Sequence, residues 1–362
     1  MSKLWPEKST QFLKLTGIKI PIIQAPMAGG PSSPSLVSAV SNAGGLGSIG
    51  GGYLSPKSLK AQILEVKSKT DRPFGVNLFI TDPGNDEIHS SDRIDKIINN
   101  YAEELGVELT GEVVPFPNFD EQIEVILENN IKVFSFTFGV PEKKYIERLK
   151  LNNTLVIGTA TSVSEAVLLN KAGCDAVVAQ GFEAGGHRGS FEYKDNIPLV
   201  GGISLIPQIA DAIDIPLIAS GGIMDGRGIY ASFALGASAV QMGTAFLTCD
   251  EAEVNKSWID LLMNSTDTSS ALTNAFTGKF ARGLNNRFMK ELKRYEDEIP
   301  EYPIQHQLTR ELRAKAKEMD NTDFMSFWAG QGSPMNRSTT AEKLINLLIE
   351  EYNDVNAKMS GD

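Results

Sequence analysis

The chain has 362 residues, 41% hydrophobic and 22% charged, which is typical of a folded protein and far from a disordered composition. Its net charge of −11 argues against a surface that binds nucleic acid regardless of sequence, because such binding depends on clustered Lys and Arg. The N-terminus lacks the apolar core of a signal peptide, and no apolar run reaches the ~18 residues of a membrane span. We therefore expect a cytoplasmic protein without a membrane partner. Two cysteines, Cys174 and Cys249, are too few for a metal-binding quartet, and we expect buried thiols and no metal.

Short apolar runs rich in Val and Ile alternate with amphipathic segments, which is the pattern of a parallel sheet built from βαβ units. A hairpin is predicted around Gly17, with Phe12, Leu13 and Leu15 on one arm, and a helix over residues 35–43. Eight strands are predicted, at residues 21–26, 45–49, 74–79, 133–137, 155–158, 176–180, 217–220 and 239–243.

Eight parallel strands with intervening helices match a (β/α)8 TIM barrel, in which loops at the carboxyl ends of the strands form the active site. A doubly wound open sheet is the alternative. Polar residues or glycines recur at the end of almost every predicted strand, including Asn77, Gln180, Gly221 and Gln241. An open sheet would concentrate them at one crevice, so the pattern favours the barrel.

Two regions add to a minimal barrel, and a third completes it. Residues 81–118 are predicted as an insertion with a helix over 93–105, a possible part of a lid. Residues 251–319 are polar and helix-prone, and are predicted to form a helical cap that contributes to a substrate pocket. Residues 340–355 are predicted to return as the last barrel helix, with a capping box of Thr339 and Glu342. The barrel would then comprise residues 1–250 and 320–362.

Two glycine loops predict a phosphate site. Ser220, Gly221 and Gly222 follow the seventh strand, and Gln241, Met242, Gly243 and Thr244 form the end of the eighth. Glycine lets main-chain N–H groups approach an anion without needing Lys. Tight turns alone would also explain one glycine pair, but two adjacent loops at these positions favour phosphate.

Strand-end side chains extend this prediction to a planar ring. Met27, Asn77 and Gln180 would offer an apolar contact and amide partners, an arrangement that suits flavin mononucleotide (FMN). The alternative for the two amides is that they satisfy main-chain groups at the strand ends.

His187 is the candidate for proton chemistry. The chain has only three histidines, His89, His187 and His306, and His187 alone lies in a glycine-rich loop, after Gly185 and Gly186. A histidine there could accept a proton from carbon or hold an anionic substrate, although a lone histidine is more often structural. The adjacent Arg188 stays unassigned.

Two further segments carry open alternatives. Lys279, Arg282 and Arg287 could clamp an anionic substrate or contact neighbouring acids. Gln331 lies between glycines at the end of residues 324–332 and could close over a cofactor, whereas Phe327 and Trp328 have the spacing of core aromatics.

Taken together, these segments resemble the nitronate monooxygenases, formerly called 2-nitropropane dioxygenases. The similarity is carried by PIIQAPMAGG at 21–30, GVNLF at 75–79, QGFEAGGHRG at 180–189, ASGGI at 219–223 and QMGTAFL at 241–247. TGKFARG and AGQG resemble the bacterial class I enzymes, which are associated with propionate 3-nitronate.

The resemblance implies an FMN-dependent barrel that oxidises alkyl nitronates with O2 after electron transfer from nitronate to flavin. By the same resemblance, Ala25, Pro26 and Met27 would line the flavin, and His187 would be the catalytic histidine. The remaining flavin contacts would come from Asn77, Gln180, Gly185, Gly222 and residues 241–244.

Two other functions remain open at this stage. A flavin-dependent enoyl-acyl-carrier-protein reductase would share the barrel, the histidine loop and a similar AGQ segment, but would need NAD(P)H. A non-catalytic flavin-binding protein would keep the fold, although His187 in its glycine loop weighs against it. The sequence leaves the physiological substrate and the oligomeric state open.

Overall fold

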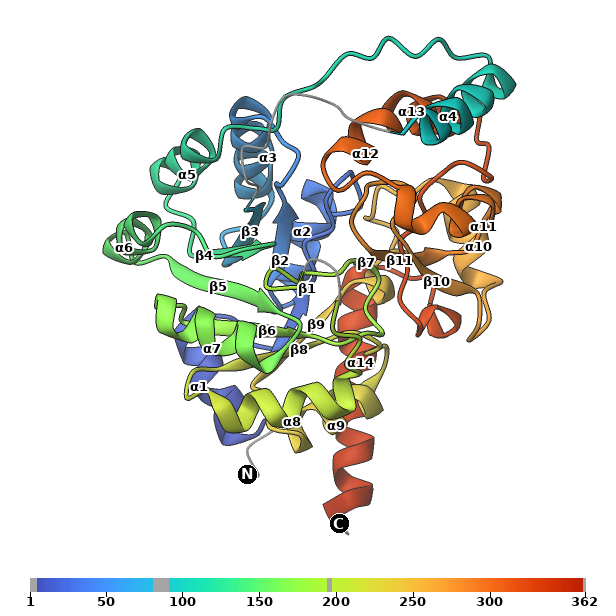
Figure 1. The fold of residues 1–362 in the computed structure, drawn as a ribbon. Helices are drawn as coiled ribbons and strands as arrows, with labels where there is room; N and C mark the ends of the chain where they lie inside the picture. Colours follow the sequence, from blue (N-terminus) through green and yellow to red (C-terminus); the bar gives the residue numbers. More distant parts are fainter. Residues whose placement is uncertain (1–4, 81–90, 194–196, 361–362) are drawn as a thin grey trace.

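The computed structural model describes residues 5–80, 91–193 and 197–360, and a sheet of eight parallel strands lies at its centre (Figure 1). The strands are β1 (Ile22–Gln24), β2 (Gly47–Gly50), β3 (Phe74–Phe79), β4 (Val133–Thr137), β5 (Leu155–Ala160), β6 (Ala176–Gln180), β8 (Leu217–Ser220) and β9 (Ala239–Met242). Neighbouring strands follow the order β1-β9-β8-β6-β5-β4-β3-β2, and a parallel bridge between Ile23 and Leu46 joins its two ends. The predicted (β/α)8 barrel is confirmed, and its predicted strand ends differ by at most two residues.

Helices surround the barrel because each buries one apolar face against the strands. They are α2 (Pro34–Asn42), α3 (Pro56–Lys69), α5 (Phe119–Glu128), α6 (Lys143–Leu151), α7 (Val163–Ala172), α8 (Gly202–Ala212), α9 (Gly226–Ala234) and α14 (Ala341–Ser360). The last of them, α14, packs against α9 and α2, where an eighth barrel helix belongs. The predicted capping box made Thr339 the N-cap, but the N-cap is Thr340. Its hydroxyl accepts a hydrogen bond from Lys343 N at 3.3 Å, and the helix begins at Ala341.

The predicted N-terminal hairpin is wrong. Residues Glu7–Thr16 form a helix, α1, which ends where Gly17 adopts a left-handed conformation with φ 77°. Gly17 is thus a helix C-cap and not a hairpin turn. Phe12 on this helix is fully buried in one cluster with Ile23, Val133 and Ile218 of the barrel strands. The helix therefore packs against the barrel through Phe12.

A second hydrophobic cluster lies in the cap, to the right of the barrel and at the upper right in Figure 1. The elements of the cap are α4 (Asp92–Leu105), α10 (Lys256–Met263), β10 (Ser270–Thr273), β11 (Ala281–Leu284), α11 (Arg287–Leu292), α12 (Ile304–Leu308) and α13 (Arg310–Glu318). Helix α4 comes from the predicted insertion and packs against α13. Its buried Ile94 and Ile98 share this cluster with Phe288 and Leu312. The first part of that insertion, residues 81–90, lies outside the described residues.

The sequence predicted a helical cap, but the cap also contains strands. Strands β10 and β11 form an antiparallel pair, and β11 also pairs with β7 (Gly186–His187), a two-residue strand in the loop after β6. In this register Ala281 lies opposite His187 and Arg282 opposite Gly186. The cap and the histidine loop of the barrel are therefore joined by main-chain pairing. Among the described helices, none combines the length and the apolar character that crossing a membrane requires.

Candidate active site

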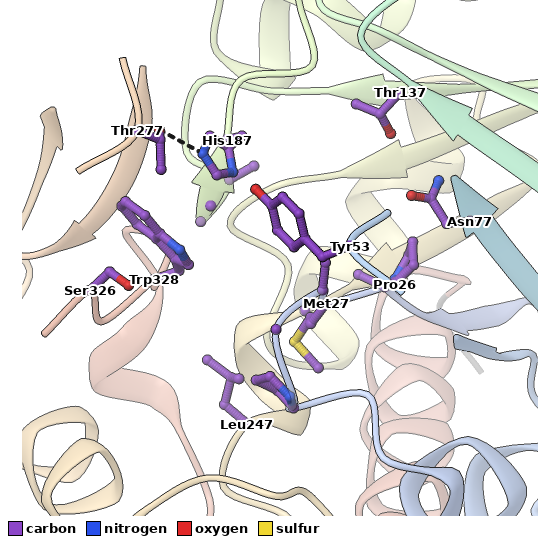
Figure 2. A pocket seen from close by; sticks show the side chains of 18 of the residues that line it. Pro26, Met27, Tyr53, Asn77, Thr137, His187, Leu247, Thr277, Ser326 and Trp328 are labelled. Atoms are coloured by element: carbon purple, nitrogen blue, oxygen red, sulfur yellow. Dashed lines mark hydrogen bonds between the residues drawn. The ribbon is translucent and has the colours of Figure 1, made fainter. Parts of the chain in front are cut away.

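The carboxyl ends of the barrel strands and the cap enclose a cavity of about 600 Å³. Figure 2 shows the strand-end residues Asn77 and Thr137 across from His187, Thr277 and Trp328. The strand ends supply Asn77, Ser135, Thr137, Thr159, Gln180, Ser220 and Gln241, and the cap supplies Thr277, His306, Arg310, Arg313, Lys317 and Trp328. The cavity thus has a barrel side rich in amides and hydroxyls and a cap side rich in cations and aromatic rings.

Twelve of the predicted cofactor residues line this one cavity. They are Ala25, Pro26, Met27, Asn77, Gln180, Gly185, Gly221, Gly222, Gln241, Met242, Gly243 and Thr244. That each of them contacts a cofactor stays a prediction.

The two glycine loops present free main-chain donors. Gly221 and Gly222 have φ values of 110° and 70°, in the left-handed region that favours glycine. The N–H groups of Gly221, Gly222 and Gly243 donate to no acceptor within the part of the chain that the structure describes. All three glycines are at least partly exposed on the cavity wall, so their N–H groups are open to a bound anion and suit a phosphate.

Gln331 does not reach the cavity, contrary to prediction. Gln331 is exposed to solvent, and its main-chain N donates to the main-chain O of Glu183 at 2.9 Å. The flanking Gly330 and Gly332 line the cavity instead, and Gly330 N donates to the hydroxyl of Thr244 at 2.9 Å. The AGQG segment therefore contributes main chain to the wall and not the glutamine amide.

Gly185 lies where two backbones pack together. A Cβ at this position would lie 2.5 Å from Gly330 N and 2.6 Å from Ala329 C. Both atoms are main chain and cannot rotate away, so only glycine fits here. The histidine loop and the AGQG segment depend on this contact.

Arg188, left unassigned by the sequence, is a structural part of the site. Its side chain is 1% exposed, and it donates to the main-chain O of Gln180 at 3.0 Å and of Gly181 at 2.7 Å. It also donates to Gln180 Oε1 at 3.2 Å. Since Gln180 Nε2 donates to the main-chain O of His187 at 3.0 Å, the carboxamide of Gln180 has one fixed orientation. Burial lowers the pKa of Arg188 to about 10, so its charge persists at neutral pH.

His187 is held on the cavity wall by the cap. Its Nε2 lies 2.9 Å from the hydroxyl of Thr277, and its ring centroid lies 5.4 Å from that of Trp328. Burial, together with the charges of Lys279 and Arg313, lowers the pKa of His187 to about 3. The imidazole is therefore neutral at physiological pH and has a lone pair with which to accept a proton.

The basic cluster that the sequence highlighted separates in the structure. Arg287 pairs with Glu104 at 2.5 Å and Glu291 at 2.8 Å, away from the cavity lining. Arg282 is buried against the ring of Phe182, with 4.3 Å to its centroid. Lys279 donates to the main-chain O of Ser190 at 3.0 Å and affects the cavity through its charge near His187. For Arg287, contact with acids is the correct alternative.

The cations that do line the cavity were missed. Arg310, Arg313 and Lys317 lie on α13, three and four residues apart, and therefore share one helical face. The sequence of this helix is typical of one exposed to solvent, because Glu311, Lys315 and Glu318 alternate with these cations. Only the shared spacing of the three cations could have indicated that one face is turned inward.

Aromatic side chains on the cavity wall were missed as well. Tyr53 stacks on His306, with centroids 5.0 Å apart and planes inclined by 11°. Phe116 approaches both Tyr302 and His306, at 5.5 Å and 6.0 Å between centroids. These residues come from three separate segments of the chain, so no local sequence pattern predicts that they are in contact.

Comparisons with known proteins agree with this geometry. The family model for nitronate monooxygenase matches residues 9–351. The chain is 43% identical over 350 residues to a probable nitronate monooxygenase of Staphylococcus aureus strain JH9, covering 95% of this chain and 98% of that one. The solved nitroalkane oxidase of Streptomyces ansochromogenes has a TM-score of 0.90 and 38% identity, covering 96% of this chain and 99% of that one. FabK from Thermotoga maritima has a TM-score of 0.77 and 31% identity, covering 97% and 98%.

The barrel has a strand-end cavity with a half-buried, neutral histidine on its wall, and the relatives show that the chain is an oxidoreductase. The chain belongs to the nitronate monooxygenase family.

Replacing Gly185 tests the close contact between the histidine loop and the AGQG segment. We expect Gly185→Ala to lose about 1–3 kcal/mol of unfolding free energy, because the new methyl group meets main chain that cannot move aside. Chemical denaturation measures this. Gly202→Ala is the matched control, since a Cβ there meets its nearest atom, Glu183 Oε2, at 3.6 Å. Equal stability of the two variants would show that the contact has no such importance.

Proposed function

We propose that the chain is an FMN-dependent nitronate monooxygenase that oxidises alkyl nitronates, including propionate 3-nitronate, with O2. The observation that carries this proposal is the meeting of three features in one cavity. These are the free N–H groups of the glycine loops, the neutral His187, and the cations of α13. A nitronate is an anion, so a cationic wall beside a neutral base suits it.

The barrel side of the cavity has the donors that FMN needs. Gly221, Gly222 and Gly243 would hold the phosphate through main-chain N–H groups, which explains how an acidic protein can bind it. Met27, Asn77 and Gln180 would contact the ring system. When bound, flavin would supply an electron acceptor for the nitronate and a route for the electrons to O2.

The residues of the chain would bind the substrate and move its proton. His187 would take the α-proton of a neutral nitroalkane or orient a nitronate that is already ionised. The rings of Trp328 and Tyr302, at 5.4 Å and 6.3 Å from the His187 ring, would keep water away from that exchange.

The cofactor and the reaction can be tested on the purified protein. We expect a flavin absorption spectrum, FMN as the compound released by heating, and O2 consumption with propionate 3-nitronate. A colourless protein that takes up no added FMN would contradict the proposal.

The enoyl-acyl-carrier-protein reductase that the sequence left open is the second candidate, and FabK matches 97% of this chain at 31% identity. Anaerobic mixing separates the two functions. Rapid bleaching of the flavin by NADPH favours the reductase, and bleaching by propionate 3-nitronate alone favours the monooxygenase.

Substitution of the histidine tests its proton-transfer role. We expect His187→Asn to retain flavin and to lose about 10²–10⁴-fold activity on neutral nitroalkanes, the usual contribution of a general base. Activity on preformed nitronates should fall much less, since their proton has already gone. O2 consumption with both substrate forms measures the difference. Equal losses on the two forms would remove the proton-transfer role.

Arg310 tests the cationic wall. Its NH2 donates to the main-chain O of Glu112 at 3.2 Å and lies 3.7 Å from Glu311 Oε1 and 4.0 Å from Glu112 Oε2, which leaves its NH1 without a partner in the described part of the chain. We expect Arg310→Met to raise KM for propionate 3-nitronate about tenfold, and KM for ethyl nitronate less than about twofold, because only the first carries a carboxylate. Arg287→Met, which removes a cation outside the cavity, is the control. The same change in KM for both substrates would contradict carboxylate recognition by Arg310.

A further inference from the structure

Thr277 touches His187 from the cap side, and none of the roles above accounts for it (Figure 2). The two residues are 90 positions apart, and the hydroxyl oxygen of Thr277 lies 2.9 Å from His187 Nε2. Thr277 is 2% exposed. Such a contact between a buried hydroxyl and a candidate base fixes more than position, because a neutral imidazole has two tautomers.

The hydroxyl of Thr277 is held in place by its own turn. The main-chain N of Thr277 and of Gly278 both donate to Asn274 O, at 3.2 Å and 2.8 Å. Gly278 has φ 79°, and a Cβ there would lie 2.2 Å from Pro300 O, so the turn packs tightly on the chain beside it. Lys279, at the end of the turn, is tied to Ser190 O at 3.0 Å. The turn therefore has little freedom to move its hydroxyl.

The single hydrogen of that hydroxyl has two possible acceptors. One is the main-chain O of Lys279, at 3.1 Å, which can only accept. The other is His187 Nε2, which can accept only if it carries no hydrogen. If Thr277 donates to Lys279 O, its lone pairs accept from Nε2–H, and both contacts are hydrogen bonds. If it donates to Nε2 instead, Lys279 O loses this donor, which is costly for a partly buried carbonyl that accepts from no other described donor.

From this count we propose that Thr277 is a positioning residue that holds neutral His187 as the Nε2–H tautomer, so that Nδ1 is the atom that accepts the substrate proton. The inference rests on the proposed function for its reaction step. Within the described residues Nδ1 has no hydrogen-bond partner, so its lone pair is available.

The surroundings of the ring support a fixed neutral imidazole. The edge of Phe138 and the ring of Trp328 approach it at 5.9 Å and 5.4 Å between centroids, which limits rotation about its side-chain bonds. Gln180 Nε2 holds the main-chain O of His187 at 3.0 Å. Burial and the charges of Lys279 and Arg313 disfavour the doubly protonated ring, whose two N–H groups would leave no acceptor.

The tautomer can be read directly from nitrogen NMR of protein with ¹⁵N-labelled histidine. In the flavin-loaded wild type we expect His187, assigned by its loss in His187→Asn, to show a protonated Nε2 and an unprotonated Nδ1. In Thr277→Val, which keeps the shape and removes the hydroxyl, we expect a mixture of tautomers. Thr277→Ser should restore the wild-type pattern. A wild-type ring protonated at Nδ1, or an unchanged pattern in Thr277→Val, would overturn the inference.

Kinetics of the same variants complete the test. We expect Thr277→Val to lower kcat/KM about 10- to 100-fold on neutral nitroalkanes and to leave preformed nitronates within about threefold, with recovery in Thr277→Ser. Thr248→Val is the control, because the buried Thr248 hydroxyl donates to Arg337 O at 2.9 Å outside the cavity lining. Equal losses in the Thr277 and Thr248 variants would overturn the positioning role. Failure of the wild type to oxidise any nitronate would instead refute the proposed function, and the NMR result would still decide the tautomer.

Discussion

The short antiparallel pairing of β7 with β11 is the interaction on which the candidate site depends. Two residues of the barrel loop, Gly186 and His187, lie opposite Arg282 and Ala281 of the cap. Beyond the pairing, Arg188 N donates to Phe280 O at 2.8 Å, which continues the same register. Without this register the Thr277 turn would not reach His187, and the cavity would lack the wall that encloses it. The cap therefore completes the site and does more than cover it.

Buried charge on the barrel side keeps the histidine loop in this register. Arg188 is enclosed by carbonyl groups on one side of the loop, and Glu165 is fully buried on the other. The carboxylate of Glu165 accepts from Ser190 Oγ at 3.0 Å and from Phe191 N at 2.7 Å. A buried ion costs several kcal/mol unless hydrogen bonds replace its water. Here Arg188 donates several through its two terminal nitrogens, while its Nε has no partner among the described residues, and Glu165 accepts several. Because those bonds come from the loop itself, the loop cannot shift without exposing an unsatisfied charge.

The sequence was informative where function depends on residues close together in the chain. Apolar runs such as the one around Asn77 and the one that ends in Gln180 predicted the barrel strands, and the glycine pairs predicted the loops with free N–H groups. It was misleading where one residue type has two uses. A glycine such as Gly17 can end a helix as well as make a hairpin turn. In the AGQG segment, the sequence did not show whether Gln331 or the glycines beside it would face the cavity, and it is the glycines that do.

The cap resisted prediction for a different reason. Thr277, Tyr53 and Arg310 meet in the cavity from segments that are distant in the sequence, and α4, from a further segment, packs on α13. An alternating charge pattern on α13 does not say which face turns inward. The barrel side supplies the groups suited to a cofactor, and these lie in local motifs that the sequence shows. The cap side supplies the groups suited to a substrate. The choice of substrate, by contrast, lies in tertiary contacts that no single segment records.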